Sequence, residues 1–170
     1  MTNKFVLLSD GSCDPKSKIG FGAYLLLSEF DIPLVSHLSI KNQIILKKFN
    51  NTSSTKLEVE TLLNALENIQ KKYKENTLIN NLIIYTDSQC IVGLARRRTA
   101  LEARNFKKKG TNKLINNARL YQKFYCFSDR LKFEIIKVAG HSGSASDSIH
   151  KVFSYVDKEV RKALRDYNCN

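Results

Sequence analysis

The sequence predicts an α/β fold with a central mixed five-stranded sheet flanked by helices. Short apolar runs with the length of buried strands, such as FVLLS and LIIYT, occur along the chain. Longer segments with apolar residues at helical spacing lie between and after them. A chain of 170 residues is most economically one domain, residues 1–170, and is long enough to bury a substantial core.

The first strand is expected at Phe5–Ser9 and the second at Ala23–Leu27, close enough in sequence to pair antiparallel. The intervening DGSCDPKSKIGFG is rich in turn-forming residues and is interpreted as a connection. Residues 32–49 contain two stretches with strand character, IPLVSHLSI and QIILKKF. A polar linker, NNTSST, then leads into a helix of about sixteen residues, in which leucine and isoleucine recur at helical spacing.

The next strand is expected at Leu82–Thr86 and is followed by a short helix. The order strand, helix, strand predicts that this strand runs parallel to the first one. Residues 96–132 form a basic and mostly helical region, and Lys132–Val138 is the last strand. A loop of small and polar residues, GHSGSASDSIHK, leads into a closing helix at Phe153–Tyr167.

The charge of the chain is unusual for its size. Lys and Arg together number 28 against 16 Asp and Glu, so the net charge is +12. A surplus of this size in a small domain predicts a polyanionic partner, most often nucleic acid. No apolar run approaches the ~20 residues that span a bilayer, and no basic helix has a clean apolar face. We therefore expect nucleic acid, and not a membrane, as the partner.

The four cysteines are Cys13, Cys90, Cys126 and Cys169, and they are scattered along the chain. They form no CxxC pair and have no histidine at zinc-site spacing, so we interpret them as reduced thiols. We expect no signal peptide, because MTNKFVLL runs directly into the first predicted strand without a cleavage site. These features predict a cytoplasmic protein, and we expect a monomer without an obligate protein partner.

Four acidic residues stand in settings that suggest a metal site. Asp10 and Asp87 each close an apolar strand, where an uncompensated buried charge would destabilise the fold by several kcal/mol. If these two strands are neighbours, both aspartates emerge at the same edge of the sheet. Glu58 and Asp157, each expected in the first turn of a helix, can lean over that edge. Oxygen ligands alone favour Mg²⁺ or Mn²⁺, and four carboxylates fit two-metal hydrolysis of phosphodiesters.

Each of these acids also has a purely structural interpretation. Asp10 can start an Asp-Gly turn, and Asp87 can cap a helix. Glu58 fits the acidic arm of a capping box that begins at Thr55. Asp157 can be a first-turn acid favoured by the helix dipole. The metal-site hypothesis rests on the joint occurrence of the four acids in this order.

The chain resembles a type 1 ribonuclease H. The strings that carry the resemblance are DGSCDPKSKIGFGAYLL, KLEVETLLNALE, IIYTDSQC and KVAGHSGS, and the weakest match lies at residues 29–52. The resemblance implies a ribonuclease H-like fold, two bound Mg²⁺ ions with Mn²⁺ as a substitute, and hydrolysis of the RNA strand of an RNA–DNA hybrid to 5′-phosphate and 3′-hydroxyl ends. It assigns His141 a role in turnover near the leaving group or metal. It assigns the metal-binding and catalytic carboxylate roles to Asp10, Glu58, Asp87 and Asp157.

The sequence departs from the family pattern at three places. DPKSK replaces a loop that usually carries glycine and asparagine. Ser54 and Thr55 stand where relatives have paired asparagines that contact 2′-hydroxyls, although hydroxyl groups can also form such bonds. Several extra residues separate His141 from Asp157, and Asp147 in this stretch is the alternative fourth ligand. Asp157 is preferred because its surroundings are helical.

A basic cluster between residues 96 and 123 resembles, in position, the handle with which some relatives grip the DNA strand. Phe106, Tyr121, Phe124 and Tyr125 interleave with its cations. A solvated helical face is the alternative interpretation of such a cluster. Contacts of lysine and arginine with phosphates strengthen binding in a salt-dependent way. Gln89, in contrast, is expected to contact the minor groove of the hybrid. The residues predicted to bind nucleic acid are Ser12, Ser54, Thr55, Gln89, Arg96, Arg97, Arg98, Lys107, Lys108 and Lys109.

Two other functions remain open at this point. A DNA nuclease or resolvase can have the same fold, because fold and metal do not choose the substrate. A non-catalytic nucleic-acid-binding module can also keep the fold. The TDSQ string and the GH loop favour a ribonuclease H over the first, and the complete set of carboxylates argues against the second.

Overall fold

The computed structural model describes residues 4–73, 81–138 and 148–169. Five strands form one sheet in the order β3-β2-β1-β4-β5. The strands are β1 (Phe5–Asp14), β2 (Ile19–Ser28), β3 (Ile45–Phe49), β4 (Leu82–Thr86) and β5 (Phe133–Lys137). β2 pairs antiparallel with β1 and β3, whereas β4 pairs parallel with β1 and β5. The prediction of a mixed five-stranded sheet is confirmed.

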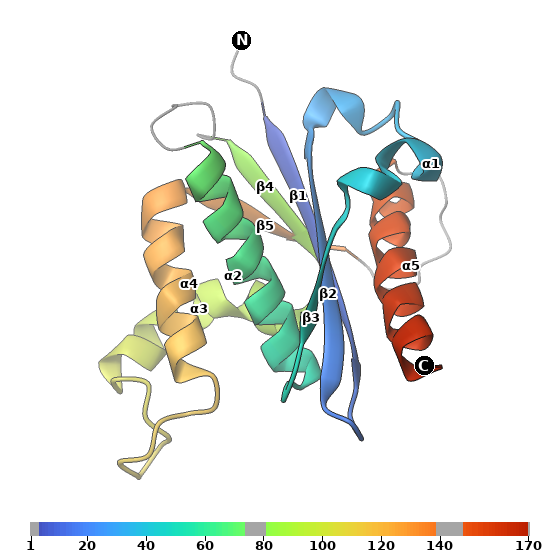
Figure 1. The fold of residues 1–170 in the computed structure, drawn as a ribbon. Coiled ribbons are helices and arrows are strands. Elements are labelled where there is room, and N and C mark those ends of the chain that lie inside the picture. The colour runs from blue at the N-terminus through green and yellow to red at the C-terminus, as the bar shows by residue number, and fades with distance from the viewer. Residues whose placement is uncertain (1–3, 74–80, 139–147, 170) are drawn as a thin grey trace.

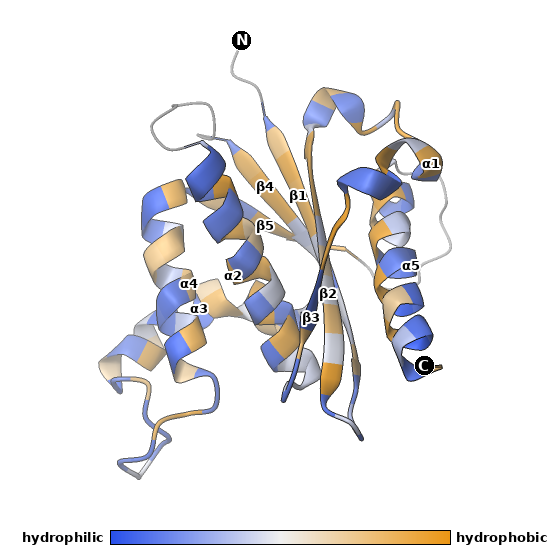
Figure 2. Cartoon of the chain, in the orientation of Figure 1, coloured by the Kyte–Doolittle hydropathy of each residue, from blue (hydrophilic) through white to orange (hydrophobic). Residues whose placement is uncertain are grey.

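Helices cover both faces of the sheet (Figure 1). The first face carries α2 (Ser54–Lys72), α3 (Gln89–Ala103) and α4 (Ala118–Leu131), and the second carries α5 (Ser148–Asn168) with the short α1 (His37–Ile40). β1 contributes to both layers, because alternate side chains of a strand point to opposite faces. Leu7 belongs to the core under α2, whereas Val6 and Leu8 belong to the core under α5. Figure 2 shows the resulting concentration of apolar residues in the central strands.

The first two strands are longer than the sequence analysis predicts. DGSCDPKSKIGFG is not a connection, because β1 continues to Asp14 and β2 begins at Ile19. Only residues 15–18 turn, and the Asp14 carboxylate accepts hydrogen bonds there from the backbone N–H groups of Lys16 and Ser17 at 3.1 and 3.2 Å. Asp10 therefore lies inside β1 and not at its end.

The segment between β2 and β3 also differs from the prediction. IPLVSHLSI is not a strand, and residues 29–43 form η1 (Glu29–Asp31), α1 and η2 (Lys41–Gln43). A capping box starts α1: the backbone N–H of Ser39 donates to Ser36 Oγ, and that of Ser36 donates to Ser39 Oγ. The second stretch, QIILKKF, does contain the predicted strand, β3.

Glycines allow α2 to lie unusually close to the β1–β2 hairpin. A Cβ atom on Gly22 would be 1.9 Å from Thr61 Oγ1, and one on Gly20 would be 2.7 Å from Leu57 Cδ2. Thr61 leaves no room for a side chain at Gly22, whereas at Gly20 the end of the Leu57 side chain would have to shift. The N-terminal half of α2, which includes Glu58, can therefore rest directly on the hairpin.

Two further predictions can be compared with the described residues. The four cysteines are free thiols, as predicted. Within residues 4–73, 81–138 and 148–169, no helix is long and apolar enough to cross a membrane.

Candidate active site

The pairing of β1 with β4 brings two aspartates together. Leu8 of β1 is the register partner of Tyr85 of β4, and two residues further along the parallel strands are Asp10 and Asp87. Both side chains are half-buried, and their charges interact. The strand order that the sequence predicts thus places these two carboxylates side by side.

The carboxyl group of Asp10 is strongly perturbed. Burial and then the charge of Asp87 raise its pKa to about 8, although the backbone N–H of Gly11 donates to Oδ1 at 2.7 Å and opposes this change. Asp157 raises the pKa further by its charge and by a hydrogen bond between the two carboxyl groups, which requires a proton on one of them. Asp10 therefore retains a proton near neutral pH unless a cation offsets the neighbouring charges.

Glu58 reaches the same cluster from α2. Its Oε2 accepts a hydrogen bond of 2.5 Å from Ser88 Oγ, a residue 30 positions further along the chain. Burial raises the pKa of Glu58, the bond from Ser88 lowers it, and the charge of Asp87 raises it. Glu58 thus lies close enough to Asp87 for their charges to interact, and Ser88 fixes the direction of its carboxylate.

The structure excludes the capping interpretations of Glu58 and Asp87. Ser53, and not Thr55, caps α2, since Ser53 Oγ accepts from the backbone N–H of Lys56. Glu58 is therefore in the second turn of α2 and not in the first. Ser88 caps α3 in the same way, so Asp87 is not the cap. Neither acid has a helix-capping role that would explain its presence.

Asp157 lies in the middle of α5 and not in its first turn, as the sequence analysis expected, because α5 begins at Ser148. The dipole interpretation fails for the same reason, since this effect is confined to the ends of a helix. Asp157 Oδ1 accepts a hydrogen bond of 2.6 Å from Arg161 Nε, one turn further along. Asp147 and His141 lie outside the described residues.

The donor set fits a hard divalent cation by its chemistry. Four carboxylates with like charges and no sulfur or nitrogen ligand are typical of Mg²⁺ or Mn²⁺ sites. In the described part of the chain, no three His, Cys, Asp or Glu side chains already surround one point closely enough to hold an ion. Ser88 and Arg161 engage two of the four carboxylates instead. A cation would offset the repulsion that raises the pKa of Asp10.

Comparison with known families agrees with this arrangement. The family model for RNase H matches residues 2–164. The chain belongs to the RNase H family. A search among curated proteins finds no match. Membership makes the chain a nuclease of the kind that acts on RNA–DNA hybrids, in a family that generally uses divalent metal ions.

Several residues predicted to contact the hybrid border the carboxylates. Ser12 lies two residues beyond Asp10 on β1 and therefore on the same face of the strand. Ser54 and Thr55 are exposed at the start of α2, and Gln89 is exposed at the start of α3. A family member that holds a hybrid over these carboxylates would thus meet hydroxyl and amide groups from three elements.

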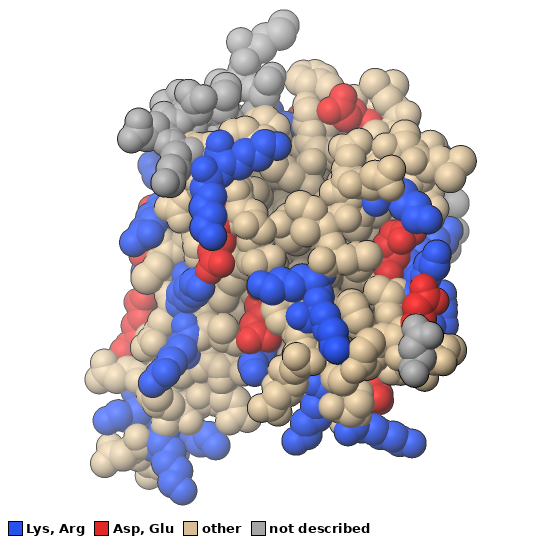
Figure 3. Space-filling model, in the orientation of Figure 1, with Lys and Arg blue, Asp and Glu red and all other residues tan. Residues whose placement is uncertain are grey.

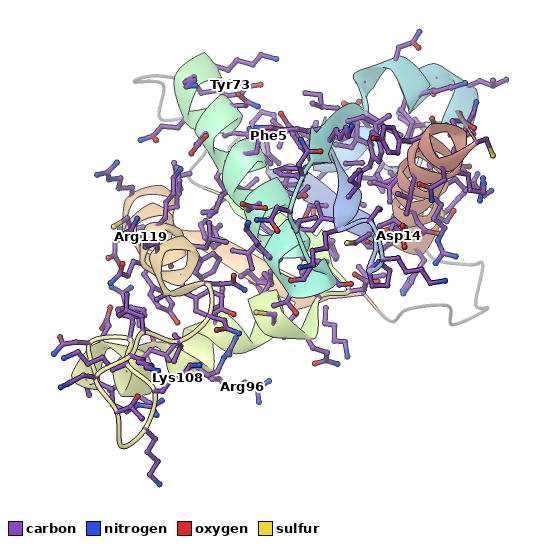
Figure 4. The ribbon with its side chains drawn as sticks, turned by 60° about the horizontal axis from the view of Figure 1, so that its bottom comes forward. Phe5, Asp14, Tyr73, Arg96, Lys108 and Arg119 are labelled. Carbon is purple, nitrogen blue, oxygen red and sulfur yellow. The ribbon has the colours of Figure 1, made fainter. Side chains whose placement is uncertain are left out.

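The basic cluster divides between α3 and the loop that follows it. Arg96, Arg97 and Arg98 are in α3, whereas Lys107, Lys108 and Lys109 are in the loop. Lys107 and Leu114 form a β-bridge, and the backbone N–H of Lys108 donates to Lys113 O at 2.8 Å. Figure 3 shows Lys and Arg side chains over this loop at the lower left, and Figure 4 shows Arg96 and Lys108 on the same side of the molecule. The lysines line a shallow hollow of about 460 Å³.

Arg98, one of the predicted nucleic-acid-binding residues, is bonded to two acids of the protein. Its Nε donates to Glu102 at 2.8 Å, and its Nη1 and Nη2 donate to the two carboxylate oxygens of Asp129 at 2.6 and 2.8 Å. These bonds connect α3 to α4. Arg98 therefore joins two helices and is not presented to a phosphate. Asp129, 31 positions further along the chain, balances the charge of Arg98.

Arg97 is also tied to the protein, and the aromatic residues are in the core. Arg97 Nη2 donates to the Cys90 carbonyl at 2.9 Å, and its guanidinium lies 5.6 Å from the centroid of the Tyr121 ring. The interleaved aromatic side chains are all buried, so they pack α4 and its preceding loop and do not form a stacking surface for bases. They are Phe106, Tyr121, Phe124 and Tyr125.

Sequence reasoning missed two residues that hold the carboxylates. Ser88 was quoted within TDSQ, but nothing in the local sequence showed that its hydroxyl would reach Glu58 on another helix. Arg161 could have been found, because Asp and Arg four residues apart in a helix lie on the same face.

Proposed function

We propose that the chain is an endonuclease that hydrolyses the RNA strand of RNA–DNA hybrids with two Mg²⁺ ions and leaves 5′-phosphate and 3′-hydroxyl ends. The observation that carries the proposal is the convergence of carboxylates from β1, α2, the β4–α3 turn and α5. Charge interactions link Asp10 to Asp87 and Asp157, and Glu58 to Asp87. The proposed catalytic residues are Asp10, Glu58, Asp87, Asp157 and His141.

The four carboxylates would hold the metal ions. When bound, the ions would lower the pKa of the attacking water and stabilise negative charge on the leaving oxygen. The chain itself supplies the placement of these ligands. Pairing of β1 with β4 fixes Asp10 and Asp87, Ser88 directs Glu58, and Arg161 directs Asp157. His141, whose role is assigned by resemblance, would act near the leaving group. Mn²⁺ would substitute for Mg²⁺ because both accept oxygen ligands.

The surrounding residues support a hybrid as the substrate. Ser12, Ser54, Thr55 and Gln89 offer groups that can bond to a 2′-hydroxyl, which distinguishes RNA from DNA. Arg96, about two helical turns beyond Gln89 in α3, and the lysines at 107–109, in the loop after α3, would hold phosphates of the DNA strand. Of the three arginines in this cluster, Arg96 is the one for which we retain a phosphate-binding role, because Arg97 and Arg98 are bonded within the protein.

Cleavage of end-labelled RNA–DNA hybrid, duplex RNA and duplex DNA, each with Mg²⁺ and with EDTA, tests the proposal. Only the RNA strand of the hybrid should be cut, only with Mg²⁺, and the product should be ligatable through its 5′-phosphate. Asp10→Asn should abolish cleavage and retain hybrid binding. Asp14→Asn is the matched control on the same strand, because Asp14 serves the turn.

Three results would contradict the proposal. Cutting of duplex DNA would indicate a DNA nuclease or resolvase. Hybrid binding without cleavage by the wild type would indicate a recognition module. Full activity in Asp10→Asn would show that the carboxylate site is wrongly placed.

A further inference from the structure

Exposed apolar side chains are concentrated in one short segment, away from the carboxylates. In the part of the chain that the structure describes, seven large apolar side chains are exposed, and five of them lie between residues 30 and 46. Isolated apolar residues on a surface are ordinary, but a concentration of this kind marks an interaction site. The five are Phe30, Leu34, Leu38, Ile45 and Leu46, which are 65%, 80%, 87%, 47% and 42% exposed.

The last two of these residues belong to an edge strand. β3 ends the sheet and, among the described residues, pairs only with β2. Its outer backbone groups are therefore available to another strand, which is how sheet edges bind extended peptides. Lysine residues discourage such pairing in many proteins, but Lys47 and Lys48 occupy the second half of β3. The first half, Ile45 and Leu46, is apolar.

A pocket of about 440 Å³ opens beside the apolar half of β3. Ile45 forms one wall, and Phe5, Leu26, Ile69 and Tyr73 form others. Phe5 and Tyr73 lie side by side in Figure 4, with ring centroids 6.0 Å apart. A volume of this order is within the range of ligand pockets, roughly 300–1,000 Å³, and can accept a large apolar side chain.

The charge around β3 indicates which partner fits. Residues 41–50 contain Lys41, Lys47 and Lys48 and no acidic residue, whereas the pocket is lined by one acid, Asp31, and one further lysine, Lys72. Figure 3 shows an expanse of mostly uncharged surface across the upper middle of this face, with Lys and Arg side chains below it. An acidic partner is favoured, and a second copy of the chain is disfavoured because each copy carries a net charge of +12.

We propose that β3 and the adjoining pocket bind an extended segment of an acidic partner protein, which adds to the sheet as a further strand beside β3. Side chains alternate along β3, so Ile45 and Lys47 share the face with the pocket, whereas Leu46 and Lys48 share the other face. Each face thus presents an apolar residue followed by a lysine. The matching segment has two adjacent large apolar residues next to two adjacent acidic residues, and one of its apolar side chains fills the pocket.

The pocket is separate from the carboxylate site, whereas β3 is two strands away from Asp10, because Leu46 is in register with Ala23 and Ala23 with Asp10. Phe5 lines the pocket, and Asp10 lies five residues further along β1, which corresponds to about 17 Å of strand. A strand added on the outer side of β3 would be three strand spacings, about 14 Å, from β1 and would hold the nuclease beside whatever the partner binds.

The proposal can be tested by peptide selection on phage. The library displays random linear twelve-residue peptides, and the full chain is the bait. Enriched peptides should contain an apolar pair next to an acidic pair. A labelled synthetic copy of the most enriched peptide should bind at least tenfold more weakly to Ile45→Glu and to Lys47→Glu/Lys48→Glu, as measured by fluorescence anisotropy. Leu114→Glu is the matched control, because Leu114 is equally exposed, at 49%, on the distant basic loop.

Two further measurements keep the test independent of the stability of the variants. Amide hydrogen exchange in residues 45–49 of the wild type should slow when the peptide is bound. Hybrid cleavage by Ile45→Glu should stay within twofold of wild type, which also confirms that the variant is folded.

Peptides without acidic residues, peptides that bind Ile45→Glu as well as wild type, or unchanged exchange in β3 would overturn the proposal. A wild-type dimer that Ile45→Glu converts to a monomer in sedimentation experiments would also overturn it, because the occupant would then be a second copy.

Discussion

The carboxylate cluster and the basic loop differ in the way the chain fixes them. The carboxylates come from four elements, and strand pairing, the Ser88 hydroxyl and Arg161 fix their positions. The lysines at 107–109 come from one continuous loop, which local backbone bonds hold together. Bond cleavage requires groups placed on rigid elements, whereas attraction to phosphates acts over several ångströms and tolerates motion. Substitutions in the carboxylate cluster should therefore abolish catalysis, whereas substitutions in the basic loop should gradually reduce the affinity for the hybrid.

The strongest test of this contrast is the replacement of Asp157, the fourth carboxylate. Asp157→Asn should lower kcat by more than about 100-fold with little change in hybrid affinity, because a proposed metal ligand is lost from a rigid helix. Single-turnover cleavage and filter binding separate these effects. Asp147→Asn is the control and should change kcat by less than threefold. A larger loss in Asp147→Asn than in Asp157→Asn would transfer the ligand role to Asp147.

The pH dependence of stability should reveal the crowding of charges in the first region. The pKa of Asp10 is about 8 in the folded chain, compared with 3.8 for an ordinary aspartate. Between these values the folded state keeps a proton that the unfolded chain has lost. The contribution of Asp10 to stability is therefore fully present below about pH 4 and is lost as the pH rises through 8.

Asp10→Asn should remove this dependence. In EDTA at pH 8, the variant should be more stable than the wild type by on the order of a few kcal/mol, and the two should converge near pH 4. Urea unfolding followed by circular dichroism measures the difference. Addition of Mg²⁺ should narrow this difference in stability, because the ion would stabilise the wild type. If the stabilities of the wild type and Asp10→Asn instead changed in parallel from pH 4 to pH 8, Asp10 would not be crowded by neighbouring charges.

Gly22→Ala should damage the carboxylate region through packing alone. The new Cβ would meet Thr61 at 1.9 Å, so α2 must move and carry Glu58 with it. We expect a loss of stability of about 1–3 kcal/mol and a lower kcat, with the salt dependence of hybrid binding unchanged. Gly93→Ala is the control, since a Cβ there has only ordinary contacts, the nearest at 3.5 Å, and alanine favours a helix. Wild-type stability in Gly22→Ala would contradict this account of the packing.

The smallest effect is expected from the basic loop. Replacement of Lys107, Lys108 and Lys109 by glutamine should raise KM by about tenfold, flatten the dependence of binding on salt and leave kcat unchanged. Arg98→Gln is the informative comparison. Because Arg98 bonds to Asp129 and Glu102, its loss should lower the melting temperature and leave the salt dependence intact. The reverse pattern would show that Arg98, and not the loop, holds the hybrid.

The parallel pairing of β1 with β4 could be predicted from the sequence, whereas the length of the first hairpin could not. Apolar runs separated by a helix predict a parallel β1–β4 pair, and this pair places Asp10 beside Asp87. The glycines and aspartates after Ser9 indicate a turn when they are considered locally. Backbone pairing with β2 overrides that preference, because Gly11 and Gly22 lie opposite each other in the ladder under α2.

Side-chain partners were the less predictable part of the site. The bond between Ser88 and Glu58 joins residues 30 positions apart, and the Arg98–Asp129 pair joins residues 31 positions apart. Neither follows from periodicity within one helix, because each depends on how two helices pack. The Asp157–Arg161 pair was accessible to sequence reasoning, since it follows from helical spacing alone.

The position of α5 has a consequence for the point during synthesis at which the enzyme becomes active. Asp157 is synthesised 147 residues after Asp10, and the two meet only when α5 docks on β1 and β2. A growing chain that has already built most of the sheet still lacks one of its four acids. Cleavage would therefore begin only after α5 has left the ribosome and has docked, so nuclease activity would report that α5 has packed on the sheet.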